Sequence, residues 1–378
     1  METLEKNIAT PLSRQLYRIL LQRIASGRYA AGRKLDSIRV LTQEFKVSSM
    51  VVNQALELLE KDRLIIRVPA KGVYVSSSES VATKPLQLLI AFPELAISPD
   101  LLPLSDWHAN SEIYRGILGF GSRHNVNVHL EYFQEAADEF ELNGQLRRLD
   151  GYDAVLFYGN QRQRLRALAH TVVPYVFDVG WAELPHCFGH EHIVGFTVAD
   201  NAEVLLRFMR QRNFRRYGSI TLYHPEEEQH FLLHRLELIH QRAAGFGVEP
   251  DEEFQFETAE APAEAVRQIA DRLRRGCPDL IFFNSDELEL MYRAAARAGL
   301  LPGRDVNFLY MGPGPVCPQA TRVAEPYFQI GETVVRKLVE CARGNQPWAP
   351  GVTLLSSRVI EGGSTGAGRE ELPAAKVV

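Results

Sequence analysis

At 378 residues the chain is long enough for two or three domains, and its 46% hydrophobic and 24% charged residues exclude a disordered or fibrous protein. The longest apolar stretch near residue 90 spans residues 86–93, far fewer than the roughly 20 residues that cross a bilayer. The N-terminus has acidic side chains and no apolar signal core, so we expect a cytoplasmic protein. The four cysteines lack C-x-x-C spacing, which predicts reduced thiols.

Charge is divided unevenly along the chain. Residues 1–78 contain 13 Lys and Arg against 7 Asp and Glu, which leaves 29 against 40 for the remainder. A basic segment joined to an acidic body suggests that only the basic segment meets a polyanion.

The first 75 residues predict three short helices followed by a hairpin. Apolar residues recur at helical spacing over 12–24. A second helix is expected from Ser37, a suitable N-cap, to Phe45, and a third begins at Ser48. Strands are expected at 64–68 and 73–75. This is the winged-helix order, in which the third helix fits the major groove of DNA.

The same segment contains ordered motifs, which are Pro11-Leu12, Leu35-Asp36-Ser37-Ile38-Arg39, Val47-Ser48, Ala55-Leu56, Leu64-Ile65 and Lys71-Gly72-Val73-Tyr74-Val75. With these motifs, residues 10–75 resemble the winged helix-turn-helix head of the GntR family of transcription regulators. The resemblance implies binding to double-stranded DNA. The chain departs from the family at Asp36, which replaces a proline, and at Ser49 and Asn53, where arginines are usual.

The resemblance gives Arg39 a base-reading role. On the third helix, Asn53 and Gln54 have amide groups that suit adenine, and Met50 can contact a thymine methyl group; the alternative is a solvated helix surface. Phosphate contacts, which position without specifying sequence, are expected from Lys46, Arg67 and Lys71. The predicted DNA-binding surface also includes Ser37, Ser48, Ser49 and Gly72.

Residues 76–85 have no apolar periodicity and predict a linker, and the body that follows alternates strands and helices. The expected strands are 86–92, 126–132, 154–158, 174–178, 217–222, 254–256, 280–284 and 306–311, and the first helix of the body is expected at 112–124. Repeated β-α units predict an α/β fold with parallel sheets covered on both faces. A break near 194–200 suggests two lobes, and the natural ligand site of such a body is a cleft between lobes at the carboxyl ends of the strands.

Further motifs occur in order along the body: Val198-Ala199-Asp200-Asn201, Arg235-Leu236-Glu237, Asn284-Ser285-Asp286-Glu287, Arg358 and Ser364-Thr365. With these, residues 86–365 resemble the LacI-type, periplasmic-binding-protein-like effector domain. A GntR head on a LacI-type body resembles arabinose-repressor-like regulators. The resemblance implies a homodimeric repressor that a sugar releases from a DNA operator, and it leaves 366–378 as a flexible tail. Met311-Gly312-Pro313-Gly314 replaces the usual glycine-x-aspartate, which bears on ligand identity.

The resemblance places Arg235 and Asp286 at ligand-holding positions. An arginine fork of donors and an aspartate acceptor together suit polyols, although the two side chains also suit a structural ion pair. Aromatic rings that could stack on a sugar face are Trp181, Trp107 and Tyr158. Polar groups expected at strand ends are Asp178, Asn160 and Asp200.

Three other functions were weighed. Three histidines and a thiol in the segment 186–192 suit a metal-responsive regulator, although a surface loop is the default. A pyridoxal-phosphate enzyme fused to a GntR head needs a Schiff-base lysine, and only Lys337 and Lys376 follow Lys84. A transport solute-binding protein needs an export signal. We therefore expect no enzyme, no cofactor and no metal.

Overall fold

The structure is a computed structural model that describes residues 4, 11–25, 27–62, 64–69, 71–76, 85–93, 104–158, 163–181, 189–222, 230–258, 262–284, 288–312, 319–344 and 346–366. Its contacts form two compact units. The first unit comprises Met1–Pro99, Ile113–Val194 and Phe328–Thr353, and contains an N-terminal domain, the head, together with one sheet, the N lobe. The second comprises Asp100–Glu112, Gly195–Tyr327 and Leu354–Val378, and is called the C lobe.

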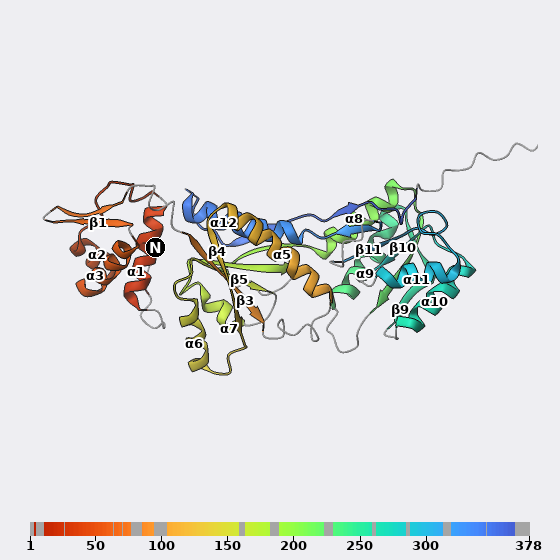
Figure 1. Cartoon of the computed structure of the whole chain (residues 1–378), viewed down its shortest axis with the longest axis horizontal. Helices are drawn as coiled ribbons and strands as arrows, with labels where there is room; N and C mark the ends of the chain where they lie inside the picture. Colours follow the sequence, from red (N-terminus) through yellow and green to blue (C-terminus); the bar gives the residue numbers. More distant parts are fainter. Residues whose placement is uncertain are drawn as a thin grey trace, which may run out of the picture. The chain divides into compact units, whose positions relative to one another are not determined.

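The head consists of the three helices and the hairpin predicted from the sequence (Figure 1). Its elements are α1 (Leu12–Ala25), α2 (Ile38–Phe45), α3 (Ser49–Lys61), β1 (Ile65–Val68) and β2 (Gly72–Val75). The hydroxyl groups of Ser37 and Ser48 accept the N-cap hydrogen bonds of α2 and α3. The antiparallel hairpin has the register Ile65↔Val75, and its inner face joins the apolar core of the three helices.

The N lobe is a six-stranded sheet with the order β13-β7-β6-β5-β3-β4. Its strands are β3 (Leu86–Pro93), β4 (Val126–Phe133), β5 (Ala154–Tyr158), β6 (Tyr175–Trp181), β7 (His192–Phe196) and β13 (Gly351–Leu354). Its helices are α5 (Leu104–Arg123), α6 (Glu139–Leu149), α7 (Gln163–Ala169) and α12 (Tyr327–Arg343). The core strands β3, β5 and β6 pair in parallel and are almost continuously apolar, as expected of strands buried on both faces.

Close helix packing completes the N lobe. A side chain at Gly116 of α5 would meet the backbone of Phe328, and one at Gly331 of α12 would meet the backbone of Ile113. These two glycines therefore permit a close approach of α5 and α12 that no larger residue allows. Apolar residues of α6 and α7 pack with alternate residues of β3, β5 and β6.

The C lobe is a second six-stranded sheet, with the order β14-β12-β11-β10-β8-β9. Its strands are β8 (Arg216–Leu222), β9 (Glu249–Thr258), β10 (Leu280–Phe283), β11 (Phe308–Met311), β12 (Thr321–Ala324) and β14 (Arg358–Ile360). Its helices are α8 (Val198–Gln211), α9 (His230–Ala243), η2 (Ala244–Phe246), α10 (Pro262–Arg275) and α11 (Leu288–Ala298). Two apolar clusters, one with α10 and α11 and one with α8 and α9, cover the two faces of the sheet.

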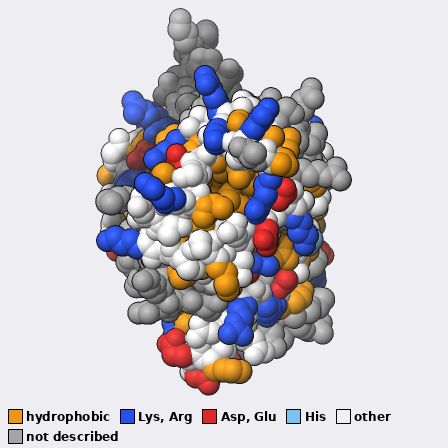
Figure 2. Space-filling model, turned by 90° about the vertical axis from the view of Figure 1, so that its left-hand side faces the viewer, with side chains coloured by type: hydrophobic (Ala, Val, Ile, Leu, Met, Phe, Trp, Pro, Cys, Tyr) orange, Lys and Arg blue, Asp and Glu red, His pale blue; other side chains and the backbone are white. Residues whose placement is uncertain are grey.

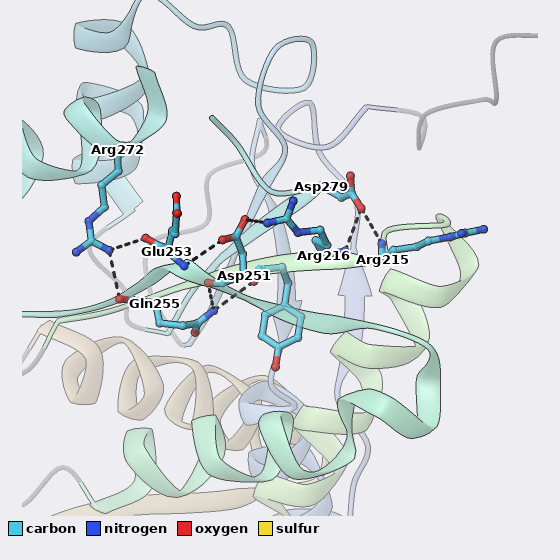
Figure 3. Close-up of polar contacts among 8 residues, drawn as sticks. Arg215, Arg216, Asp251, Glu253, Gln255, Arg272 and Asp279 are labelled. Carbon is cyan, nitrogen blue, oxygen red and sulfur yellow. Dashed lines mark hydrogen bonds and ion pairs between the residues drawn. The ribbon is translucent and has the colours of Figure 1, made fainter. Parts of the chain in front are cut away.

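Polar contacts fasten the outer strand of the C lobe (Figure 3). Arg216 of β8 pairs with Asp251 of β9 at 2.9 Å, and the Gln255 amide donates to the Asp251 carbonyl at 3.1 Å. From α10, Arg272 donates to the carbonyls of Glu253 at 3.0 Å and Gln255 at 3.3 Å. A guanidinium from helix α10 therefore lies along the outer edge of β9.

The predicted α/β class with two parallel-dominated sheets is confirmed, and within the C-lobe sheet β12 pairs in parallel with β11 and antiparallel with β14. Some boundaries were wrong: α5 begins at Leu104 rather than near 112, and β9 at Glu249 rather than 254. The expected break near 194–200 is the end of β7 and the start of α8, so Asp200 lies in a helix. No helix in the described part of the chain is long and apolar enough to cross a membrane. The predicted linker, apart from Ser76 and Pro85, and the tail beyond residue 366 lie outside the described residues.

Candidate DNA-binding surface and effector site

The exposed end of helix α3 carries most of the predicted base readers. Ser49, Met50 and Gln54 are exposed, and the Met50 side chain is 66% exposed although it is apolar. On α2, Arg39 is exposed and has no ion-pair or hydrogen-bond partner within the described part of the chain. These side chains are therefore available to a ligand of the head.

Helix α3 and strand β1 share a polar clamp. Arg67 Nε lies 3.0 Å from the Glu60 carboxylate, and its Nη1 donates to Asn53 Oδ1 at 3.4 Å. The Asn53 amide nitrogen donates in turn to the carbonyl of Ser49 at 3.0 Å. Asn53 and Arg67, predicted to contact a base and a phosphate, thus already have partners within the head. Their DNA contacts stay predictions.

The remaining predicted DNA residues lie at exposed turns of the head. Lys46 follows α2 with a left-handed backbone, φ 53°, and its side chain is exposed, as is that of Lys71 before Gly72. Figure 2 shows Lys and Arg side chains spread over the surface around a hydrophobic patch. Side-chain cations of this kind suit a polyanion.

The C lobe encloses Arg235 in a polar network. The side chain is fully buried; its Nε donates to Asn284 Oδ1 at 2.6 Å and its Nη1 to Glu325 Oε1 at 3.0 Å. Asn201 donates to the same Glu325 oxygen at 2.7 Å. Burial raises the pKa of Glu325 above its ordinary value, and Arg235 opposes that shift. Arg235 and Glu325 form a charge-balanced pair away from solvent.

The network continues toward partly exposed Asp200. The hydroxyl of Ser357 is bonded to the side-chain oxygen of Asn201, and the backbone N–H of Ser357 donates to Asp200 Oδ2 at 2.7 Å. Asp200 occupies the first turn of α8, whose N-cap is Thr197. The fold therefore connects Arg235 and Asp200, two predicted effector residues, through side chains of the residue that follows β12, of α8 and of the segment after β13.

The N lobe encloses a different arrangement. Arg166 of α7 lies 2.8 Å from Asp178 of β6 and 3.0 Å from Glu191, and each of the three side chains is only 2% exposed. Burial raises the pKa of Asp178 to about 7, with Arg166 opposing the shift and Glu191 adding to it. One guanidinium thus lies between two buried carboxylates, an arrangement that favours a proton on one of them.

Of the other predicted effector residues, the structure describes the side chain of Tyr158 alone. Tyr158, at the end of β5, is half-buried, and its ring centroid lies 6.0 Å from that of Tyr114 on α5. Trp107 and Trp181 lie in α5 and β6, but their side chains are outside the described part. Outside the described residues altogether are Asn160 and Asp286.

The part of the 186–192 segment that the structure describes has internal contacts. His190 stacks on His170 with centroids 3.8 Å apart, and Glu191 pairs with Arg166. His192 contacts the Ala349 carbonyl at 3.1 Å and Thr353 Oγ1 at 2.8 Å. No three His, Cys, Asp or Glu side chains of the described residues are grouped to hold a metal ion.

The sequence did not predict the residues that pair with the buried polar residues. These are Glu325, the partner of Arg235, and Arg166 and Glu191, which form a cluster with Asp178. A signal existed for Glu325, because this acidic residue directly follows two apolar residues, Val323 and Ala324, at the end of β12. The signal does not identify its partner. Arg166 carries no such mark, since basic residues are common along amphipathic helices.

Comparisons with known proteins distinguish the head from the body. Residues 12–75 match the family described as bacterial regulatory proteins, gntR family. The HTH-type transcriptional regulator YjiR of Escherichia coli (strain K12) is 33% identical over 100 residues, which are 25% of this chain and 21% of that protein. The chain thus spans about a fifth of this relative's length.

Solved structures resemble the body. A LacI-family regulatory protein from Chloroflexus aggregans, 16% identical, has a TM-score of 0.55 over 74% of this chain and 98% of its own. The regulator CelR in complex with cellobiose, 17% identical, has a TM-score of 0.51 over 86% of this chain and 94% of its own. The chain therefore joins a GntR-type DNA-binding head to a body with the fold of LacI-type regulators.

Proposed function

We propose that this chain is a sequence-specific transcription regulator, a repressor, whose head binds an operator and whose two-lobed body binds a small effector, a sugar. The GntR-type head supports the DNA part of the proposal. The LacI-type fold supports the effector part, and one protein of that fold is described as a cellobiose complex. The boundaries that we propose are a head at 1–75, a linker at 76–85 and a body at 86–365.

The observation that carries the proposal is the exposed reading end of the head. Arg39 is exposed and without an internal partner among the described residues, and it is accompanied by exposed Met50 and Gln54. An arginine fork binds the O6 and N7 acceptors of guanine bidentately in the major groove. A helix end that presents such side chains has a geometry suited to base edges.

The test of the DNA part is Arg39→Ala, measured by footprinting and gel shift on the chain's own promoter region. We expect operator affinity to fall by roughly 10-fold to 100-fold, the effect of losing one bidentate base contact of about 1–3 kcal/mol. The matched control is Arg304→Ala in the C lobe, where the arginine is 71% exposed. An unchanged footprint for Arg39→Ala would remove the base-reading role of Arg39.

For the effector part, exposure separates the predicted residues. Tyr158 and Asp200 are partly exposed, whereas Arg235 and Asp178 are enclosed by internal partners. We propose that Tyr158 stacks on the sugar and that Asp200 accepts hydroxyl protons. Arg235 and Asp178 then hold the interior of each lobe, and a direct contact to the ligand would require that these networks open.

We propose that the chain forms a homodimer through the edge strand of the N lobe. β4 is the last strand of its sheet, and its Leu130 and Tyr132 are 58% and 44% exposed. Leu118 of α5 is 55% exposed beside a groove of about 340 Å³ whose other lining residues belong to α5 and β4. A second copy covers this apolar face by a two-fold contact and places two heads on a pseudo-palindromic operator.

We propose that the chain is not an enzyme and acts in the cytoplasm, where its DNA is found. The proteins that it resembles are regulators. The scarcity of lysine after residue 84 argues against Schiff-base chemistry, since Lys337 lies within helix α12.

A further inference from the structure

A turn of the N lobe contacts the head within the same compact unit. Arg14 and Arg18 stand one helical turn apart on α1 and share one carboxylate. Arg14 Nη1 lies 2.7 Å from Asp150 Oδ2, and Arg18 Nη2 lies 2.6 Å from Asp150 Oδ1. Asp150 is the C-cap residue of α6. Two guanidinium groups, one on each carboxylate oxygen, fix both the distance and the direction of the contact.

The inner pair is shielded from solvent. The side chains of Arg18 and Asp150 are 14% and 19% exposed, whereas Arg14 is 43% exposed. Exposed ion pairs contribute little because water and salt screen them. The Arg18 pair is therefore the stronger part of the contact, and Arg14 adds to it at the rim.

The same turn also holds the first strand of the sheet. Asp153 Oδ2 accepts a hydrogen bond from the backbone N–H of Gln87 at 2.7 Å, and the Asp153 N–H donates to the Gln87 carbonyl at 2.9 Å. Gln87 is the second residue of β3, directly after the predicted linker. Gly151 has φ +100° and permits the reversal. The turn thus fixes the body at the point where the linker enters it.

On the head, helix α1, which bears the two arginines, also contacts α3, the predicted recognition helix. Tyr17 lies between the two arginines along α1, and its hydroxyl donates to Asp62, the C-cap residue of α3. The opposite end of α3, with Ser49 and Met50, stays exposed. Contact between head and lobe therefore leaves the reading end uncovered.

We propose that Asp150 is a positioning residue that anchors the head to the N lobe through Arg14 and Arg18, and that this anchor sets the half-site spacing that the protein accepts. A head held by a linker alone samples many distances from the second head of a dimer, whereas an anchored head samples few. The spacing part rests on the proposed function. The anchor itself does not.

The anchor is tested first without DNA, by hydrogen exchange on the full chain. Arg18→Gln changes the head and should speed amide exchange in the lobe turn 150–153. Asp150→Asn changes the lobe and should speed amide exchange in α1. Each rate should rise by about tenfold, which corresponds to the loss of one hydrogen bond to a charged group. Asp150→Glu keeps the carboxylate and should restore slow exchange in α1. Glu264→Gln, which removes an exposed carboxylate of the C lobe, is the matched control. Faster exchange confined to the mutated element would overturn the anchor.

The spacing is then tested on the duplex that the wild-type chain selects from a random pool, with base pairs inserted or deleted between its half-sites. We expect the wild type to lose at least about tenfold in affinity per altered spacing, and Asp150→Asn to bind all spacings within about twofold. Equal discrimination by both proteins overturns the spacing role. Failure of the wild type to select any duplex, with reciprocal exchange intact, overturns the proposed function and leaves the anchor standing.

Discussion

Among the described residues, each lobe buries one arginine, and the two lobes compensate its charge differently. In the C lobe, Arg235 faces one carboxylate, Glu325, and side-chain amides complete the contacts of the pair. In the N lobe, Arg166 faces two carboxylates, Asp178 and Glu191. The buried C-lobe pair is charge-balanced, whereas the buried N-lobe cluster has one more carboxylate than guanidinium.

Because of this difference, we expect the two lobes to respond differently when a buried charged residue loses its partner. A buried charge without compensation is expensive, so a network with one cation and one anion loses stability when either is removed. A network with a carboxyl group that titrates near neutrality can take up or release a proton instead. We therefore expect the C lobe to be sensitive to mutation and the N lobe to be sensitive to pH.

The largest effect is expected from Arg235→Met. The change leaves Glu325 buried without its cation and should lower the free energy of unfolding by about 3–5 kcal/mol, as for other broken buried pairs. Chemical denaturation monitored by circular dichroism measures it. Arg235→Met combined with Glu325→Gln should recover part of the loss, and a double variant no more stable than the single one would contradict the charge-balance explanation.

A comparable effect is expected from pH. Because the pKa of Asp178 is raised from 3.8 to about 7, the folded chain keeps a proton that the unfolded chain releases above about pH 4. The stabilising contribution of Asp178 is complete below pH 4 and is lost as pH rises to 7, by on the order of 4 kcal/mol at 1.36 kcal/mol per unit. Unfolding of the wild type and Asp178→Asn is compared between pH 4.5 and 8. A stability difference that does not change over this range would exclude the titration.

The smallest effect is expected from the effector. A sugar at about 100 times its Kd should raise the free energy of unfolding by about 2.7 kcal/mol, which a thermal-shift screen of mono- and disaccharides detects. Tyr158→Ala should remove most of this shift, whereas Asp178→Asn should retain it, because Tyr158 is half-buried and Asp178 is enclosed by partners. The reverse result would place Asp178 at the ligand and show that the N-lobe network opens.

The sequence predicted the elements of the head and most of the body because their periodicity is local. Ser37 and Ser48 mark helix starts through their own hydroxyl groups, and the apolar strands of both lobes stand between polar turns. The short strand β7 was missed because it follows a histidine-rich segment and has no alternation. The start of α5 was missed because its first turns follow a long stretch without periodicity.

The sequence predicted the candidate site only in part, because the residues that form it lie far apart along the chain. Arg235 was predicted from the resemblance to the LacI-type body, and Asp178 as a polar group at the end of a strand. Their partners lie elsewhere in the sequence: Glu325 is 90 residues from Arg235, and Arg166 precedes Asp178 by 12 residues. Sheet order, not sequence separation, decides such pairs. The sequence therefore indicated the charged residues but not whether a ligand or another side chain balances them.

The contacts of Arg272 with the outer strand of the C lobe have a consequence for assembly in crowded surroundings. The carbonyls of Glu253 and Gln255 are two residues apart, so they face the same side of β9, and the guanidinium occupies both. A neighbouring chain finds these two acceptors taken and cannot use them to extend the sheet, so this border of the C lobe is protected against edge-to-edge pairing between copies.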